Sequence, residues 1–98
     1  MSEQRTLCRT PAPGKKPTSI PTWKYDAVRS AILEVVPREE PGLLAKDLPQ
    51  RVAAALTSDL RDRLGSVSWH TTTVKLEMEV AGELRRVEGA RPQRLVRT

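Results

Sequence analysis

The stretch that decides the fold is residues 66–97, SVSWHTTTVKLEMEVAGELRRVEGARPQRLVR. Ser66 and Ser68 can each offer a side-chain oxygen to the free N–H groups at a helix start, so a helix is expected from about Val67. No breaker interrupts the segment before Gly82, which lacks a Cβ and accepts the left-handed conformation that commonly ends a helix. The segment therefore predicts one long helix with well-marked ends.

Two short runs follow that helix on either side of a turn. Residues 84–87 and 93–97 mix apolar and basic side chains, and residues 88–92 between them contain Gly89 and Pro92. Glycine and proline at such a position indicate a turn, so the simplest structure is a β-hairpin. The hairpin carries five arginines, which are Arg85, Arg86, Arg91, Arg94 and Arg97.

Three further helices are predicted upstream. One follows Thr22, whose hydroxyl can cap it, and ends at the Val36-Pro37 pair because proline disfavours a helical predecessor. A second spans about 47–57, with Asp47 as its cap, and a short third spans about 58–65. The apolar residues 43–45 between the first two are too few for a helix and predict a brief strand against the hairpin.

This element order indicates a mainly α (α+β) protein with a winged helix-turn-helix fold. It has three main helices and a small C-terminal β-hairpin wing, and a chain of 98 residues is enough for one small core. Residues 23–98 are expected to form this winged-helix domain. Residues 1–22 contain four prolines and little to bury, and they predict an extended basic arm.

The same segments resemble a family of small uncharacterised bacterial proteins with a winged-helix-like body. The resemblance rests on the run WHTTTVKLEME at residues 69–79 with Gly82, on PQRL at 92–95, on PGK at 13–15 and on YDA at 25–27. It covers most of the chain. It implies a fold, and it implies no particular activity.

The positive charge is concentrated at the two ends of the chain. The net charge of +5 divides into +3 for residues 1–22, −1 for residues 23–82 and +3 for residues 83–98. A basic excess is often only a solvated surface. Its segregation to an arm and a hairpin favours an anionic partner, and arginine suits phosphate because its planar fork binds bidentately.

The long helix at 67–81 carries two apolar stripes. At 100° per residue, one stripe should pack on the first two helices and contains Val67, Thr71, Val74, Met78 and Ala81. The other lies almost opposite and contains Trp69, Thr73, Leu76 and Val80. Large apolar side chains there should be covered. Two covers are open: the chain's own arm, through Leu7, Ile20 and Trp23, or a second copy in a homodimer with Trp69, Leu76 and Val80 at the interface.

Enzymatic chemistry has little support in this sequence. There is one histidine, His70, which is expected at the surface, and one cysteine, Cys8, with no base beside it in the sequence. No Cys/His spacing predicts a metal site, and no motif predicts a cofactor or a small-molecule substrate. A single cysteine and the lack of an apolar span or signal peptide predict a cytoplasmic protein that is not in a membrane.

The leading hypothesis is a small DNA-binding protein, in which the wing and arm contact the backbone of double-stranded DNA and which acts as a transcriptional regulator. The candidate contacts are Lys15, Lys16, Ser68, Thr72, Lys75, Arg85, Arg86, Arg91 and Arg94. Simpler roles stay open: Ser68 as a helix cap, Lys75 as the i,i+4 partner of Glu79, and the arginines as solvated groups paired locally with Glu83 and Glu88. The alternative function is a winged helix that binds another protein and no DNA.

Overall fold

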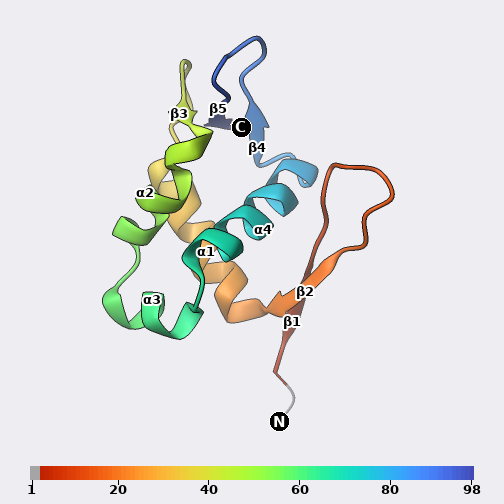
Figure 1. Cartoon of the computed structure of the whole chain (residues 1–98), viewed down its shortest axis with the longest axis vertical. Helices are drawn as coiled ribbons and strands as arrows, with labels where there is room; N and C mark the ends of the chain where they lie inside the picture. The colour runs from red at the N-terminus through yellow and green to blue at the C-terminus, as the bar shows by residue number, and fades with distance from the viewer. Residues whose placement is uncertain (1–2) are drawn as a thin grey trace.

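Residues 3–98 are described by a computed structural model, and they form four α-helices and two small antiparallel sheets (Figure 1). The structure is mainly helical, as the α+β expectation stated. A single turn of 3-10 helix, η1 (Ala45–Asp47), leads directly into α2. The helices are α1 (Thr22–Val35), α2 (Leu48–Ala55), α3 (Ser58–Leu64) and α4 (Val67–Val80).

One sheet joins the middle of the chain to its C-terminus. Its strands are β3 (Leu43–Leu44), β4 (Leu84–Arg86) and β5 (Arg94–Arg97), and β5 lies between the other two. Leu43 pairs with Leu95, and Leu84 pairs with Arg97. The brief strand at 43–44 and the pairing of the two C-terminal runs were both predicted from the sequence.

Residues 5–21 differ from the expected extended arm, because they form a β-hairpin. Strands β1 (Arg5–Cys8) and β2 (Thr18–Pro21) pair antiparallel, with Thr6 opposite Ile20 and Cys8 opposite Thr18. Pro11, Pro13 and Pro17 lie in the connecting loop, and the fourth proline, Pro21, is the last residue of β2, so no proline interrupts the pairing inside a strand. Proline content therefore marked the loop and did not prevent pairing.

The β1–β2 hairpin is part of the body of the protein. Cys8 and Ile20 are buried in the main core, and β1 packs against both α4 and α1. The Leu7 side chain points to the opposite face of the strand and is 62% exposed. In Figure 1 the loop of this hairpin extends beside the C-terminal end of α4. The boundary expected at residue 22 therefore does not separate an arm from a domain.

Helix α4 packs on α1 and α2 and is central to the core. The stripe predicted to face inward does so through Thr71, Val74 and Met78, while Val67 is half-buried and Ala81 is exposed. Their neighbours in the core are aliphatic side chains from all parts of the fold, including Val28, Ile32, Val52, Leu64, Leu84 and Leu95.

Of the side-chain caps predicted for the three longer helices, the one at α4 forms and those at α1 and α2 do not. The Ser66 hydroxyl accepts a hydrogen bond from the Trp69 N–H at 3.1 Å, as predicted. The Thr22 prediction is wrong because α1 begins at Thr22 itself, and its hydroxyl is 2.8 Å from the Thr6 hydroxyl in the neighbouring hairpin. Asp47 precedes α2 but makes no side-chain cap, because η1 already continues the chain into the helix.

Candidate functional site

The arginines of the C-terminal hairpin are mostly engaged within the protein. Arg85 forms an ion pair with Glu40 at 3.2 Å, and Arg86 donates from Nε to Glu79 at 2.6 Å. These partners differ from Glu83 and Glu88, the acids nearest in sequence. The sequence indicates only which acids are near in the chain, whereas the fold places Glu40 of the α1–β3 loop beside Arg85.

Two more of these arginines hold backbone carbonyls. Arg94 donates to the Gly42 carbonyl at 3.0 Å, and Arg97 donates to the Val36 carbonyl at 2.6 Å. Arg91 stands at the tip of the β4–β5 loop and has no polar partner among residues 3–98. The five arginines are therefore not equivalent. Within the described residues Arg91 is free, Arg85 and Arg86 are exposed but form ion pairs, and the other two hold backbone carbonyls.

Lys75 is also engaged, on the side of α4 that faces β4. Its ammonium is 3.1 Å from Glu79, and only 13% of its side chain is exposed. Glu79 is 9% exposed and takes a second cation, Arg86, on its other oxygen. Lys75 is thus the i,i+4 partner of Glu79, although it is much less exposed than a surface pair. Ser68 and Thr72, the other two candidate contacts on α4, are exposed.

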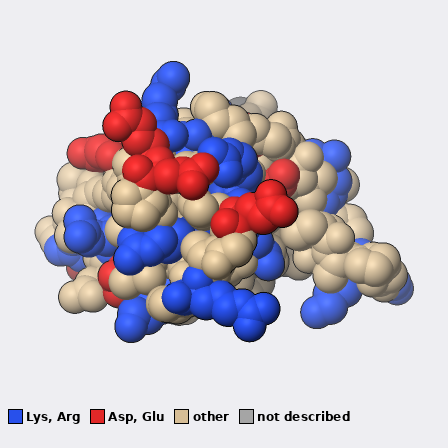
Figure 2. Space-filling model, turned by 90° about the horizontal axis from the view of Figure 1, so that it is seen from above, with Lys and Arg blue, Asp and Glu red and all other residues tan. Residues whose placement is uncertain are grey.

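Six basic side chains of residues 3–98 are exposed and make no ion pair or hydrogen bond to the described residues. They lie in the β1–β2 loop, the α1–β3 loop, η1, α2 and the β4–β5 loop, and they are Lys15, Lys16, Arg38, Lys46, Arg51 and Arg91. Figure 2 shows basic groups along the lower edge of the view from above and on the part that projects to the right. Acidic groups interrupt them elsewhere on that face.

The outward stripe of α4 is largely uncovered. Trp69 is 48% exposed and Val80 is 37% exposed, while Leu76 is half-buried. Of the three residues expected to fold back on this stripe, Ile20 lies in the core and Leu7 points to solvent. Trp23 instead packs beneath the Arg63 guanidinium, 4.9 Å from its ring centre.

His70 is buried, which corrects the expectation of a surface residue. Its Nδ1 lies 2.7 Å from the Ser66 carbonyl oxygen, and its ring meets the Trp69 ring edge-on at 4.8 Å between centroids. His70 follows Ser66 and precedes Val74 by one helical turn each, so it lies on the flank of the buried stripe. The sequence did contain a signal for this position: His70 lies one turn before Val74 and next to Thr71, two residues of the stripe predicted to face inward.

A buried carboxylate joins the β1–β2 hairpin to α4, and sequence analysis missed it. Glu77 is 7% exposed and accepts hydrogen bonds from the Arg9 N–H at 2.9 Å, from Nε at 2.9 Å and from Nη2 at 2.7 Å. These bonds hold the pKa of the Glu77 carboxyl below its usual value despite the opposing effect of burial. Arg9 and Glu77 are 68 residues apart, so no local pattern pairs them.

Cys8 is buried next to Arg9, so its reactivity indicates whether the β1–β2 hairpin is docked on α4. Burial, with a smaller contribution from the Glu77 charge, raises the pKa of the Cys8 thiol to about 11. We therefore expect the native protein at pH 8 to react with a thiol reagent such as iodoacetamide at least about tenfold more slowly than the protein in denaturant. Mass spectrometry of timed samples measures this. Equal rates in the two conditions would mean that the hairpin does not stay docked.

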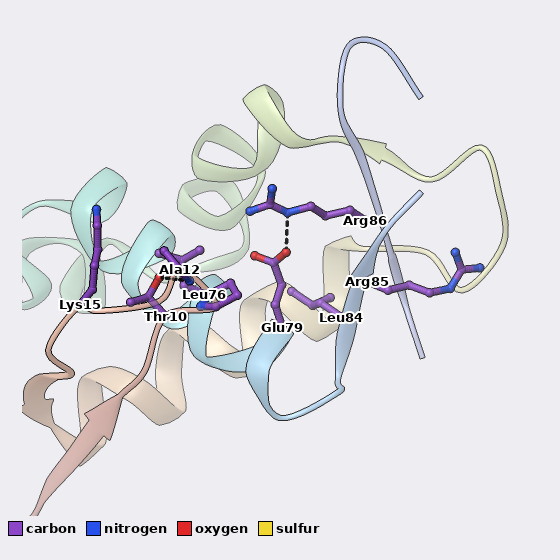
Figure 3. Close-up of a pocket in the computed structure, with 9 residues that line it drawn as sticks. Thr10, Ala12, Lys15, Leu76, Glu79, Leu84, Arg85 and Arg86 are labelled. Carbon is purple, nitrogen blue, oxygen red and sulfur yellow. Dashed lines mark hydrogen bonds and ion pairs between the residues drawn. The ribbon is translucent and has the colours of Figure 1, made fainter. Parts of the chain in front are cut away.

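A groove lies between the β1–β2 loop, the C-terminal half of α4 and strand β4. It has a volume of about 760 Å³ and is open to solvent on one side. Figure 3 shows Leu76 and Glu79 reaching into it from α4, with Arg86 bonded to Glu79 across it. We call this feature the groove, and its lining consists of Thr10, Pro11, Ala12, Lys15, Leu76, Glu79, Leu84, Arg85 and Arg86.

Two chemical features bear on what this chain can hold. Among residues 3–98 no three His, Cys, Asp or Glu side chains are grouped closely enough to bind a metal ion. In the same part of the chain, no helix has the length and apolar character needed to cross a membrane.

The fold and its charged surface define a small α+β protein in which two hairpins flank one central helix. The chain belongs to a family of unknown function, DUF6958, whose model matches residues 5–95. The match includes the β1–β2 hairpin and the β4–β5 hairpin as far as the first half of β5, and it confirms the resemblance to an uncharacterised family. No curated protein and no solved structure matches the chain.

Proposed function

We propose that this protein is a winged-helix DNA-binding protein that holds double-stranded DNA by its phosphates. In this assignment α4 is the recognition helix, β4 and β5 form the wing, and β3 completes the sheet. The order of helices and strands supports the assignment, as does the position of β5 between β3 and β4. A fold supports many functions, so the argument for DNA rests on charge.

The observation that carries the proposal is the placement of the free cations. Lys46 and Arg51 belong to η1 and α2, the elements before the recognition helix, and Arg91 is at the tip of the wing. Lys15 and Lys16 lie in the second hairpin loop. Together with Arg38 in the α1–β3 loop, these are the side chains that can neutralise phosphate without breaking an existing contact, because the other basic groups of residues 3–98 already have polar partners.

We assign the DNA contacts accordingly. Ser68 and Thr72 are exposed on α4 and can donate hydrogen bonds to phosphate or to base edges. Lys46, Arg51 and Arg91 are exposed on other elements and are assigned to phosphates. Lys75 is left out because it holds Glu79, and Arg94 is left out because it holds the Gly42 carbonyl. The contacts are with the backbone for the most part, which predicts broad sequence tolerance.

Binding of a fluorescently labelled random-sequence duplex, followed by anisotropy, tests the proposal. We expect micromolar affinity at about 50 mM salt and a log–log salt slope of about −3 to −5, one unit for each phosphate neutralised. Arg51→Ala and Arg91→Ala, made singly, should each weaken binding to all duplexes and reduce the slope by about one.

Arg5→Ala is the matched control. Arg5 is equally basic and exposed, but it lies on β1 and is bonded to Ser19. Its loss should leave both affinity and slope unchanged. Absence of binding at about 50 mM salt, or an equal effect of all three substitutions, would overturn the proposal.

The exposed stripe on α4 favours a second function, that of a protein-interaction module. Trp69 and Val80 form an apolar surface that a groove-reading helix does not need, and a second copy of the chain is the partner to test first. If the stripe is a homodimer interface, Trp69→Asp should convert a dimer to a monomer in sedimentation velocity. A wild-type protein that is monomeric at about 100 μM would exclude the homodimer.

A further inference from the structure

The groove beside α4 combines an apolar floor with a basic rim. Leu84 is buried at its base, and Leu76, Pro11 and Ala12 add apolar surface. Lys15 and Arg86 stand at its edges, whereas the Arg85 side chain starts beside the groove and points away from it toward Glu40 (Figure 3); the two arginine side chains are each 50% exposed. A surface of this kind recognises a chain that carries apolar and negatively charged side chains together.

Glu79 is the only acidic residue of the groove, and its charge is neutralised, so it does not repel a negatively charged partner. Glu79 is 9% exposed, and its charge is offset by Lys75 at 3.1 Å and by Arg86 at 2.6 Å. Arg86 uses Nε for this bond, and its Nη1 lies 3.0 Å from the side-chain amide of Gln93, which leaves Nη2 available at the surface. The effect of Glu79 is to hold the Arg86 guanidinium at the groove edge (Figure 3).

Arg85 has an exchangeable partner. Its ion pair with Glu40 joins two side chains that are each about half exposed, at 3.2 Å. Exposed pairs of this kind contribute little to stability, so Arg85 can leave Glu40 at small cost and turn toward a carboxylate bound in the groove. Lys15 has no polar partner among residues 3–98 and needs no exchange.

We propose that the groove docks an acidic peptide segment of a partner protein, with an apolar side chain against Leu76 and Leu84 and carboxylates on Lys15, Arg85 and Arg86. This goes beyond DNA binding and, apart from Lys15, uses different side chains. A second copy of this chain is a poorer occupant, because each copy carries a net charge of +5. A nucleic acid is also poorer, because an aliphatic floor offers its base edges no hydrogen-bond partner.

The test uses the full chain and a fluorescein-labelled synthetic peptide in which leucines alternate with glutamates. We expect a Kd of about 1–100 μM at physiological salt by anisotropy. Replacing the glutamates with glutamines, or the leucines with serines, should each weaken binding by at least about tenfold. Equal binding of the glutamine peptide would show that charge is not read and would overturn the proposal.

Two double variants with the same change in net charge locate the site. Lys15→Glu with Arg85→Glu should abolish peptide binding, whereas Lys46→Glu with Arg51→Glu should retain it within about twofold. The second pair should instead abolish DNA binding, so failure of one proposal is distinguishable from failure of the other. Thermal unfolding followed by circular dichroism checks that both variants are folded.

Amide chemical shifts give a readout that does not depend on a variant. Peptide titrated into ¹⁵N-labelled protein should shift the resonances of Leu76, Leu84 and the 10–15 loop ahead of those of α2. Shifts centred on Lys46 and Arg51 would mean that the peptide binds where DNA binds, and would overturn the proposal. So would a groove closed by a second copy, seen as a dimer that Ala12→Asp dissociates and Trp69→Asp leaves intact.

Discussion

Gly42→Ala is expected to destabilise the protein by about 3 kcal/mol or more, the largest effect of any conservative substitution considered. Gly42 has a φ of +80°, a left-handed conformation that alanine adopts at a cost of about 1 kcal/mol. A Cβ at this position would also overlap the Leu95 carbonyl oxygen and come within 2.9 Å of the Val96 Cγ1. Both neighbours belong to β5, the central strand of the sheet.

The clash cannot be relieved cheaply, because the Leu95 carbonyl is backbone and cannot turn aside as a side chain could. For a domain of this size the expected loss corresponds to a fall in the melting temperature of about 12 °C or more. Urea unfolding followed by circular dichroism measures the free energy of unfolding directly.

Gly82→Ala provides the comparison for Gly42→Ala. Gly82 also has a φ of +80°, but a Cβ there would meet nothing within 4 Å. Its substitution should therefore cost only about 1 kcal/mol, for the backbone conformation alone. Similar losses for the two substitutions would show that β5 yields to the added methyl group, and that the close approach at Gly42 is not a constraint on the fold.

Glu77→Gln is expected to destabilise the protein by about 2 kcal/mol at pH 7 and by much less at low pH. The substitution keeps the shape of the side chain, but it removes the charge that accepts three hydrogen bonds from Arg9. Since the folded-state pKa of Glu77 lies below its unfolded value, the stabilisation is fully present above the unfolded pKa of about 4.3. It is lost as the pH falls from there through the folded-state pKa.

The measurement is urea unfolding of both proteins from pH 7 to pH 3. The two free energies should converge at the acid end, because protonated Glu77 resembles glutamine. Glu34→Gln controls for the loss of a surface acid, since Glu34 is exposed on α1, and its effect should stay within about 0.5 kcal/mol. A difference between wild type and Glu77→Gln that does not change with pH would contradict the role of the charge.

The same variant should loosen the β1–β2 hairpin more than the rest of the protein. Cys8 lies next to Arg9 on β1 and is protected only while the hairpin is docked. Its labelling by iodoacetamide at pH 8 should therefore become faster in Glu77→Gln than in wild type by a factor larger than global unfolding accounts for. Unchanged labelling would mean that Arg9 and Glu77 do not hold the hairpin.

Helix boundaries and inward-facing residues were predictable because their causes are local. Ser66 caps α4, Gly82 adopts a φ of +80° just beyond it, and the spacing of Thr71, Val74 and Met78 places them on one face. The strand at Leu43 was predicted because three apolar residues between two helices have few other structures. The turn that separates β4 and β5 was marked by its glycine and proline.

The candidate site was predictable only in part. Composition indicated a basic hairpin, but which arginine is free depends on acids that are distant in sequence, as Glu40 is from Arg85. The groove consists of three segments brought together by the docking of the β1–β2 hairpin. That hairpin was missed because a proline-rich segment gives little local signal for strands of four residues.

The sequence by itself determined the helices, the C-terminal hairpin and the excess of positive charge, because propensity, capping and apolar spacing act over a few neighbouring residues. Only the tertiary structure decided that residues 5–21 join the core, that Glu77 is a buried partner of Arg9, and that six cations among residues 3–98 stay free. These outcomes depend on contacts between residues tens of positions apart, and the energy of such contacts is set by burial and geometry that no local pattern encodes.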